Sequence, residues 1–250
     1  ADIYYPESDL DRGSGLRLRY RNGNFMKIIG RIRTDFKEKF GIPRQSGLVE
    51  ELTAKIYFEP EYRNIDAFKG LEQFNYIWLI WKFSETVTDA FKASVRPPRL
   101  PRNEHLGVFA TRSPYRPNPI GLSSVKLISV EETEDGPVLT VGGADLLDGT
   151  PIYDIKPYLP YSDCHIDALA GYTEATGKHK LQVEIAKSEL NKINPDKREA
   201  LVKVLAEDPR PSYQKSDETR VYGLCFAGYE VKFKVVGEVL KVVVITTTVE

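Results

Sequence analysis

The sequence predicts a mainly β protein, with an antiparallel β-barrel in residues 26–165 and a smaller α+β domain in residues 181–250. Runs rich in β-branched and aromatic residues recur at short intervals and are separated by turn signals such as Asp135-Gly136 and Asp148-Gly149. Helical periodicity is almost absent before residue 165, and the strand–helix alternation of a doubly wound sheet is missing. Many short strands with tight turns are typical of a closed antiparallel barrel.

Residues 1–25 lack the apolar core of a signal peptide. The single methionine of the chain, Met26, directly precedes the first strand-like run. We expect Met26 to be the native start and residues 1–25 to be a leader, or misassigned sequence, of uncertain origin.

The barrel strands are predicted from composition and alternation. In residues 52–59, Ala54, Ile56 and Phe58 alternate with polar neighbours, which predicts one buried face and one wet face. The nearly continuous apolar run in residues 71–83 predicts a buried strand whose tryptophans belong to the core. Both Asp-Gly pairs predict hairpin turns. Further strands are expected over residues 26–33, 120–130, 137–141 and 150–155.

The C-terminal part follows a polar connector in residues 166–180. A short strand near residues 181–185 precedes the clearest helix, which Asn194 is expected to cap and Pro195 to begin. Asp208-Pro209 is expected to end it. Its apolar face is formed by Ala200, Leu201, Val204 and Leu205. Three more strands are predicted between residues 220 and 248.

Composition is that of an ordinary globular protein, with 41% hydrophobic and 28% charged residues. The formal net charge is −1, so any surface that binds phosphates must be local. We expect Cys164 and Cys225 to be buried free thiols in a reducing compartment, because they form no CxxC pair. No apolar run approaches the length of a transmembrane helix. We therefore expect a cytoplasmic protein.

Residues 95–121 concentrate arginine and proline. Five arginines accompany one carboxylate, Glu104, and the prolines exclude helix and central strand from most of the stretch. A short β-prone run, Gly107–Thr111, lies between two arginine-bearing loops. Stiff backbone lowers the entropy lost when arginines are held around an anion. We interpret the stretch as a preorganised anion-binding loop rather than a solvated linker.

Four motifs, in the same order along the chain, resemble those of the TrmO family (also called TsaA or YaeB-like) of tRNA (adenine-37 N6)-methyltransferases. They are VRPPRL (95–100), GVFATRSPYRPNPIG (107–121), DLLDGTPIYDIKPYLPYSD (145–163) and DPRPSY (208–213). The resemblance covers roughly residues 26–235. This chain departs from the family at Pro101-Arg102, where the family usually has two glycines, so its loop is more restricted and carries an extra charge.

The resemblance implies S-adenosylmethionine as cofactor. The residues that match cofactor-binding positions of the family are Pro43, Arg44, Gln45, Ser84, Glu85, Arg112, Leu122, Asp154, Ile155, Lys156 and Pro157. Ser84-Glu85 matches by position only, because the family usually has His-Gln there. Asp154 is suited to accept hydrogen bonds from a ribose or an amine, and Lys156 to meet a carboxylate. From the residues alone, Asp154 and Lys156 also fit an ordinary surface salt bridge.

The resemblance further implies N6-threonylcarbamoyladenosine, at position 37 beside the tRNA anticodon, as methyl acceptor. That nucleoside carries a carboxylate, which arginines bind through paired hydrogen bonds. The candidate substrate-binding residues are Arg96, Arg99, Arg116 and Tyr115. Tyr115 fits stacking on a base as well as it fits a half-buried loop aromatic. The family also implies a homodimer.

No standard catalytic motif is present: the sequence lacks G-x-G-x-x-G before a helix, a P-loop, H-E-x-x-H and G-x-S-x-G. His105, His165 and His179 have no metal-ligand spacing, so we expect no metal site and assign no catalytic residue. Methyl transfer is compatible with the lack of a standard catalytic motif, because S-adenosylmethionine brings its own activated methyl group. The alternative is a non-catalytic RNA- or nucleotide-binding β-barrel module, which would not bind S-adenosylmethionine.

Overall fold

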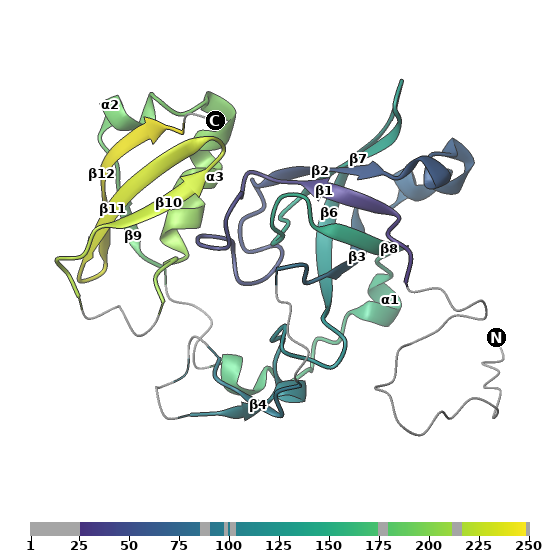
Figure 1. Ribbon diagram of the computed structural model, residues 1–250, viewed down its shortest axis with the longest axis horizontal. Coiled ribbons are helices and arrows are strands. Elements are labelled where there is room, and N and C mark those ends of the chain that lie inside the picture. The colour runs from purple at the N-terminus through teal and green to yellow at the C-terminus, as the bar shows by residue number, and fades with distance from the viewer. Residues whose placement is uncertain are drawn as a thin grey trace.

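The computed structural model describes residues 26–85, 91–97, 100, 104–174, 180–211 and 217–248. Its N-terminal part is a closed antiparallel barrel with strand order β1-β2-β7-β6-β3-β8 (Figure 1). The barrel strands are β1 (Gly30–Arg33), β2 (Thr53–Phe58), β3 (Tyr76–Lys82), β6 (Ile120–Thr133), β7 (Gly136–Gly142) and β8 (Pro151–Pro157). The predicted barrel is therefore confirmed. The expected leader, residues 1–25, lies outside the described residues.

The barrel interior is filled by every second side chain of its strands. On β2, Ala54, Ile56 and Phe58 are buried and their neighbours are exposed, as predicted. On β3 the strand prediction is confirmed, but burial alternates along it. Trp81 is buried in the barrel core, whereas Trp78 lies on the outer face and donates from Nε1 to Asp163 at 2.8 Å. The prediction that both tryptophans belong to the core is wrong for Trp78, because successive strand residues point to opposite faces.

The two Asp-Gly signals have different outcomes. Asp135-Gly136 lies at a two-residue hairpin in which Thr133 pairs with Gly136, whose φ is +103°. Asp148-Gly149 forms a turn, but the hairpin prediction is wrong there. Strands β7 and β8 are not neighbours in the barrel, since β8 pairs with β3 and β1 instead.

The arginine- and proline-rich stretch lies beside the barrel (Figure 1). Its β4 (Ser94–Val95) pairs with β5 (Leu106–Gly107), and η4 (Val108–Ala110) follows directly. The β-prone run Gly107–Thr111 is therefore mostly a 3-10 turn, closed by the amide of Thr111 donating to the carbonyl of Val108 at 3.1 Å. Other short helices are η1 (Pro60–Tyr62), η2 (Ile65–Phe68), η3 (Leu71–Gln73), α1 (Pro160–Asp163) and η5 (Gly171–Thr173).

The C-terminal part is a four-stranded sheet, ordered β10-β11-β12-β9, packed against helix α3 (Pro195–Ala206). The predicted apolar face of α3 is confirmed, but the side chain of Asn194 makes no capping hydrogen bond. The remaining elements are β9 (Gln182–Glu184), α2 (Lys187–Leu190), β10 (Tyr222–Phe226), β11 (Tyr229–Val236) and β12 (Val239–Thr247).

The loop of residues 36–52 connects the two parts. Its buried side chains Phe36, Val49 and Leu52 belong to the hydrophobic cluster of the C-terminal sheet and α3, not to that of the barrel. This loop carries the candidate residues Pro43, Arg44 and Gln45. The C-terminal core therefore supports one side of the candidate site, while the division of the chain at residues 165 and 181 stays a prediction.

Candidate functional site

One group of candidate residues lies on the outer face of the barrel. Leu122 on β6 and Asp154 on β8 both pair with Ile80 of the intervening strand β3, so their side chains share one face. Leu122 is 54% exposed. The ammonium of Lys156 lies 2.8 Å from the carboxylate of Asp154, and both side chains are substantially exposed. An apolar surface with a carboxylate and a cation beside it is therefore available to a ligand.

An irregularity in β8 sets this orientation. The register of β8 against β3 shifts between Ile152 and Asp154, so that Ile80 pairs with Asp154 whereas Trp81 pairs with Ile152. The extra residue, Tyr153, reverses the phase of the strand. Ile152 therefore points into the barrel and is fully buried, and Asp154 points outward. Without the bulge, these two residues would share one face.

A second group joins the 36–52 loop to the arginine-rich stretch. The guanidinium of Arg112 donates to Oε1 of Gln45, so two of the predicted cofactor-binding segments are in direct contact. Arg44 donates from Nη2 to the carbonyl of Arg210 in the C-terminal part at 3.4 Å. Pro43 is buried. The C-terminal part thus contacts the segment that carries Arg44 and Gln45.

Asp145 belongs to this second group and was not predicted. The hydroxyl of Ser123 donates to Oδ1 of Asp145 at 2.6 Å, and Nε1 of Trp81 donates to the same hydroxyl at 3.0 Å. Burial raises the pKa of Asp145, although the Ser123 hydrogen bond and the charge of Arg112 oppose that shift. Ser123 directly follows Leu122 of the outer-face group in the chain, and the charge of Arg112 acts on Asp145. The only sequence signal for Asp145 was its position inside the DLLDGT motif.

The turn after β3 also approaches the 36–52 loop. The ammonium of Lys39 donates to the backbone carbonyl of Glu85 at 3.0 Å. Ser84 is half-buried and Glu85 exposed. The structure therefore places the Ser84-Glu85 position at the edge of the same region.

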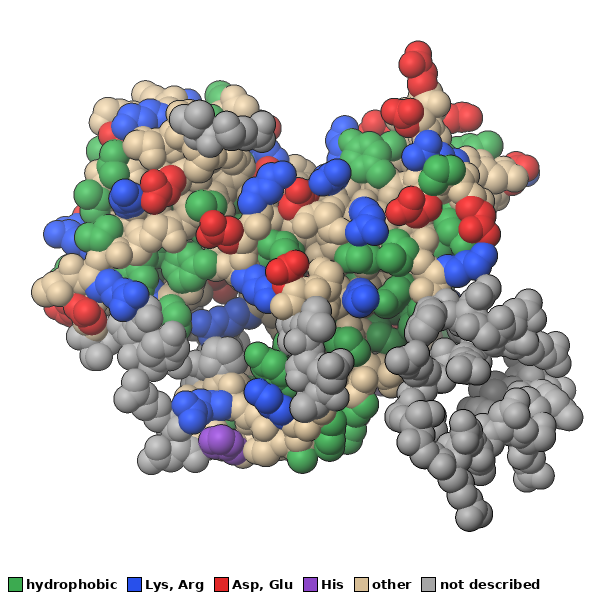
Figure 2. All heavy atoms as spheres, in the orientation of Figure 1, with side chains coloured by type: hydrophobic (Ala, Val, Ile, Leu, Met, Phe, Trp, Pro, Cys, Tyr) green, Lys and Arg blue, Asp and Glu red, His purple; other side chains and the backbone are tan. Residues whose placement is uncertain are grey.

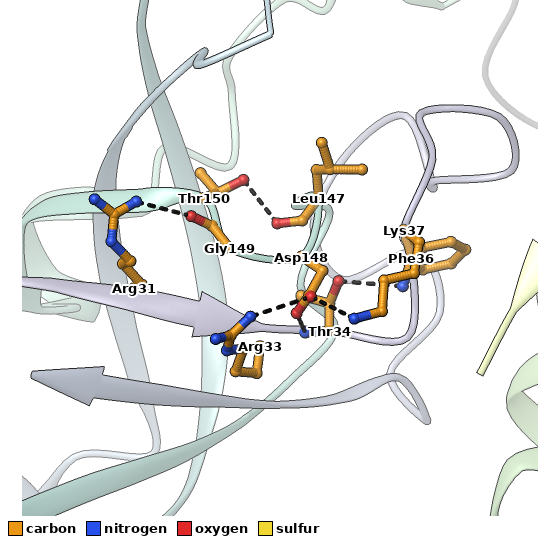
Figure 3. A network of polar contacts seen from close by, with 9 residues as sticks. All are labelled: Arg31, Arg33, Thr34, Phe36, Lys37, Leu147, Asp148, Gly149 and Thr150. Atoms are coloured by element: carbon orange, nitrogen blue, oxygen red, sulfur yellow. Dashed lines mark hydrogen bonds and ion pairs between the residues drawn. The ribbon is translucent and has the colours of Figure 1, made fainter. Parts of the chain in front are cut away.

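Asp148 fastens the start of the same loop to the DGT turn (Figure 3). Its carboxylate accepts from the amide of Thr34 at 3.0 Å and from Lys37 at 2.9 Å, and Arg33 lies 3.4 Å away. Burial alone would raise the pKa of Asp148, but these hydrogen bonds and charges outweigh it and hold the pKa below its ordinary value. Asp148 thus orders the start of the loop.

The candidate substrate residues lie in and beside the 104–116 loop. Arg116 donates from Nη1 to the carbonyls of Val108 at 3.1 Å and Thr111 at 2.6 Å, so it braces the loop. Tyr115 is partly exposed, and Arg96 is exposed. Arg99 lies outside the described residues.

The two cysteines are exposed or only partly buried. Cys164 and Cys225 are free, but Cys164 is exposed and Cys225 only partly buried, so the prediction of buried thiols is wrong for Cys164. Cys164 lies just after α1 in an exposed segment. Among the described residues, no three His, Cys, Asp or Glu side chains lie close enough to hold a metal. His179 lies outside them. No helix in the described part of the chain is long and apolar enough to span a lipid bilayer.

The fold is a closed antiparallel β-barrel with an appended C-terminal domain in which a four-stranded sheet packs against a helix. The family model described as the tRNA-methyltransferase O N-terminal domain matches residues 31–164, and the TrmO C-terminal domain model matches residues 178–248. The chain therefore belongs to the TrmO family.

Relatives resemble the chain over most of its length. The tRNA (adenine(37)-N6)-methyltransferase of Escherichia coli K12 is 41% identical over 214 residues, which are 83% of this chain and 91% of the relative. The enzyme of the same name from Eikenella corrodens is 45% identical, over 65% of this chain and 91% of the relative. A crystal structure of TrmO from Pseudomonas aeruginosa superposes with a TM-score of 0.71 at 32% identity, covering 89% of this chain and 98% of that one.

Proposed function

We propose that this chain is an S-adenosylmethionine-dependent tRNA methyltransferase that methylates N6 of N6-threonylcarbamoyladenosine at position 37. The observation that carries the proposal is the match to the Escherichia coli enzyme through both domains. The contact between Gln45 and Arg112 supports it, as does the common outer face of Leu122 and Asp154, because these residues come from separate segments.

The residues present suit the cofactor. S-adenosylmethionine, when bound, supplies a methyl group already activated for transfer. The exposed carboxylate of Asp154 is suited to accept hydrogen bonds from ribose hydroxyls or an amine, and Lys156 to bind a carboxylate. Leu122 offers exposed apolar surface on the same face of the barrel as Asp154. Gln45 holds Arg112 at the edge of the site.

The acceptor nitrogen belongs to a urea-like group whose lone pair is delocalised, so the chain has to hold it in a reactive geometry. Such positioning supplies about 7–11 kcal/mol in favourable intramolecular models. In this proposal Arg96, Arg99 and Arg116 bind the threonyl carboxylate and disperse negative charge on the carbonyl oxygen. Arg116 retains further N–H donors beyond the nitrogen that braces its loop.

Mass spectrometry of tRNA nucleosides after incubation with S-adenosylmethionine tests the reaction. We expect methylation of tRNA that carries the threonylcarbamoyl group and very little of matched tRNA that lacks it, because the carboxylate anchor is then missing. Efficient methylation of the unmodified tRNA would disprove the anchoring.

Calorimetry with S-adenosylmethionine tests the cofactor site and separates an enzyme from a non-catalytic RNA-binding module. We expect stoichiometric binding by the wild type and weaker binding by Asp154→Ala. The variant should keep its fold, because an exposed ion pair contributes only about 0–1 kcal/mol. Unchanged affinity in Asp154→Ala would remove Asp154 from the site, and no binding by the wild type would favour the module.

We further propose that the protein is a cytoplasmic homodimer that binds the anticodon loop of tRNA. The exposed apolar side chains Tyr161, Ile166 and Leu169, which are 88%, 96% and 91% exposed, support an interface with a second copy. The free thiols support a reducing compartment. Sedimentation of Ile166→Asp beside the wild type tests the dimer, since a charge in the interface should shift the variant toward the monomer.

A further inference from the structure

Three aromatic side chains near the arginine-rich loop are unusually exposed. Phe109 is 70% exposed, Phe91 52% and Tyr115 37%. The rings of Phe91 and Phe109 are stacked, with centroids 6.1 Å apart and 26° between their planes. Phe109 belongs to η4, and Val108 in the same turn is fully buried. Val108 therefore anchors the turn, while the phenyl ring of Phe109 faces solvent.

Cations accompany these rings. The ammonium of Lys92 lies 4.4 Å from the centroid of Tyr115, and the guanidinium carbon of Arg116 lies 5.6 Å from the centroid of Phe109. Arg116 is held in place by two backbone carbonyls. Figure 2 shows Lys and Arg side chains next to hydrophobic ones on the lobe that contains β4.

The charge around the rings identifies the partner. Between residues 91 and 116 the sequence has six Lys or Arg residues and one carboxylate, Glu104. The exposed apolar segment of residues 161–169 has the opposite composition, with Asp163 and Asp167 and no Lys or Arg. An aromatic surface surrounded by cations suits a stacked base and its phosphates, since every nucleobase has a π-face and the strand is an anion.

We propose that Phe91, Lys92, Phe109, Tyr115 and Arg116 form a stacking platform for an unpaired base of a single-stranded RNA loop. This inference rests on the proposed function, and it adds Phe91, Lys92 and Phe109 to the candidate substrate residues Tyr115 and Arg116. Phe109 is the main contact surface, because it is the most exposed of these three rings and already has one stacked neighbour. Arg116 braces the platform and neutralises phosphate.

The test measures binding of a fluorescent anticodon stem-loop RNA to full-length wild type, Phe109→Ala, Phe91→Ala and Phe109→Trp. Loss of one stacked base lowers affinity about 5- to 150-fold. We expect a loss in that range for Phe109→Ala, a smaller loss for Phe91→Ala and near wild-type affinity for Phe109→Trp. Tyr57→Ala, which removes a 43% exposed aromatic from β2, is the matched control and should bind like the wild type.

Salt dependence separates stacking from charge. The slope of log affinity against log salt should be the same in Phe109→Ala and the wild type, whereas Arg96→Ala should reduce it by about 1. A 2-aminopurine in the RNA loop should be quenched on binding to the wild type and less quenched with Phe109→Ala. Unchanged affinity of Phe109→Ala overturns the platform, as does a fall in its oligomeric mass, which would assign the surface to a second copy.

Measuring RNA binding and methylation by the wild type alongside the variants distinguishes a failure of the proposed function from a failure of the stacking platform. If it neither binds nor methylates the threonylcarbamoylated RNA, the proposed function fails. If it binds and methylates that RNA while Phe109→Ala does both equally well, only the stacking platform fails.

Discussion

Gly121→Ala tests whether the packing of Trp81 holds the central strand of the candidate site. Gly121 pairs with Trp81 across β6 and β3, and an alanine Cβ at that position would lie 2.2–2.5 Å from three atoms of the indole. The indole is buried and rigid, so it has to tilt away from β6. Overpacking of this kind costs about 1–3 kcal/mol. Tilting also strains the hydrogen bond from Trp81 to Ser123, a contact worth about 1 kcal/mol.

The two losses together predict a destabilisation of about 2–4 kcal/mol. In a chain of this size that corresponds to a fall in Tm of about 4–16 °C. Thermal unfolding followed by tryptophan fluorescence and by circular dichroism measures it. The matched control is Gly107→Ala, where a Cβ meets nothing within 4 Å and φ is −57°. We expect this control to stay within about 0.5 kcal/mol of the wild type. Equal Tm values for the two variants would refute the packing argument.

Two further predictions concern charged residues. Arg210→Ala should destabilise the protein by about 3–5 kcal/mol in urea unfolding, because it leaves the carboxylate of Asp208, 3% exposed, without its buried partner. Lys27→Ala, which breaks an ion pair exposed on both sides, should leave the stability close to that of the wild type; similar losses for both variants would contradict the difference in burial. Asp148 has a folded-state pKa below its ordinary value of 3.8, so its stabilisation is present above that pH and is lost as the pH falls through the folded-state pKa. The stability difference between wild type and Asp148→Asn should therefore shrink on acidification, and a difference that grows there would reverse the sign we assign.

Local chemistry made much of the fold predictable. The alternation of Ala54, Ile56 and Phe58 depends only on the period of a strand, and the apolar face of α3 only on the period of a helix. The turn at Gly136 depends on a residue that adopts positive φ easily. These elements were predicted correctly because neighbours in sequence decide them.

Tertiary structure alone decided which residues meet. The outward direction of Asp154 depends on a bulge at Tyr153, and a shift of one residue in register is invisible in the composition of a strand. The network of Asp145, Ser123 and Trp81 joins three segments that are far apart in sequence. The burial of Phe36 in the C-terminal core likewise depends on a contact between distant parts. The sequence by itself determined strands, turns and the helix face through short-range periodicity and backbone preference, while pairing register and long-range packing built the site from them.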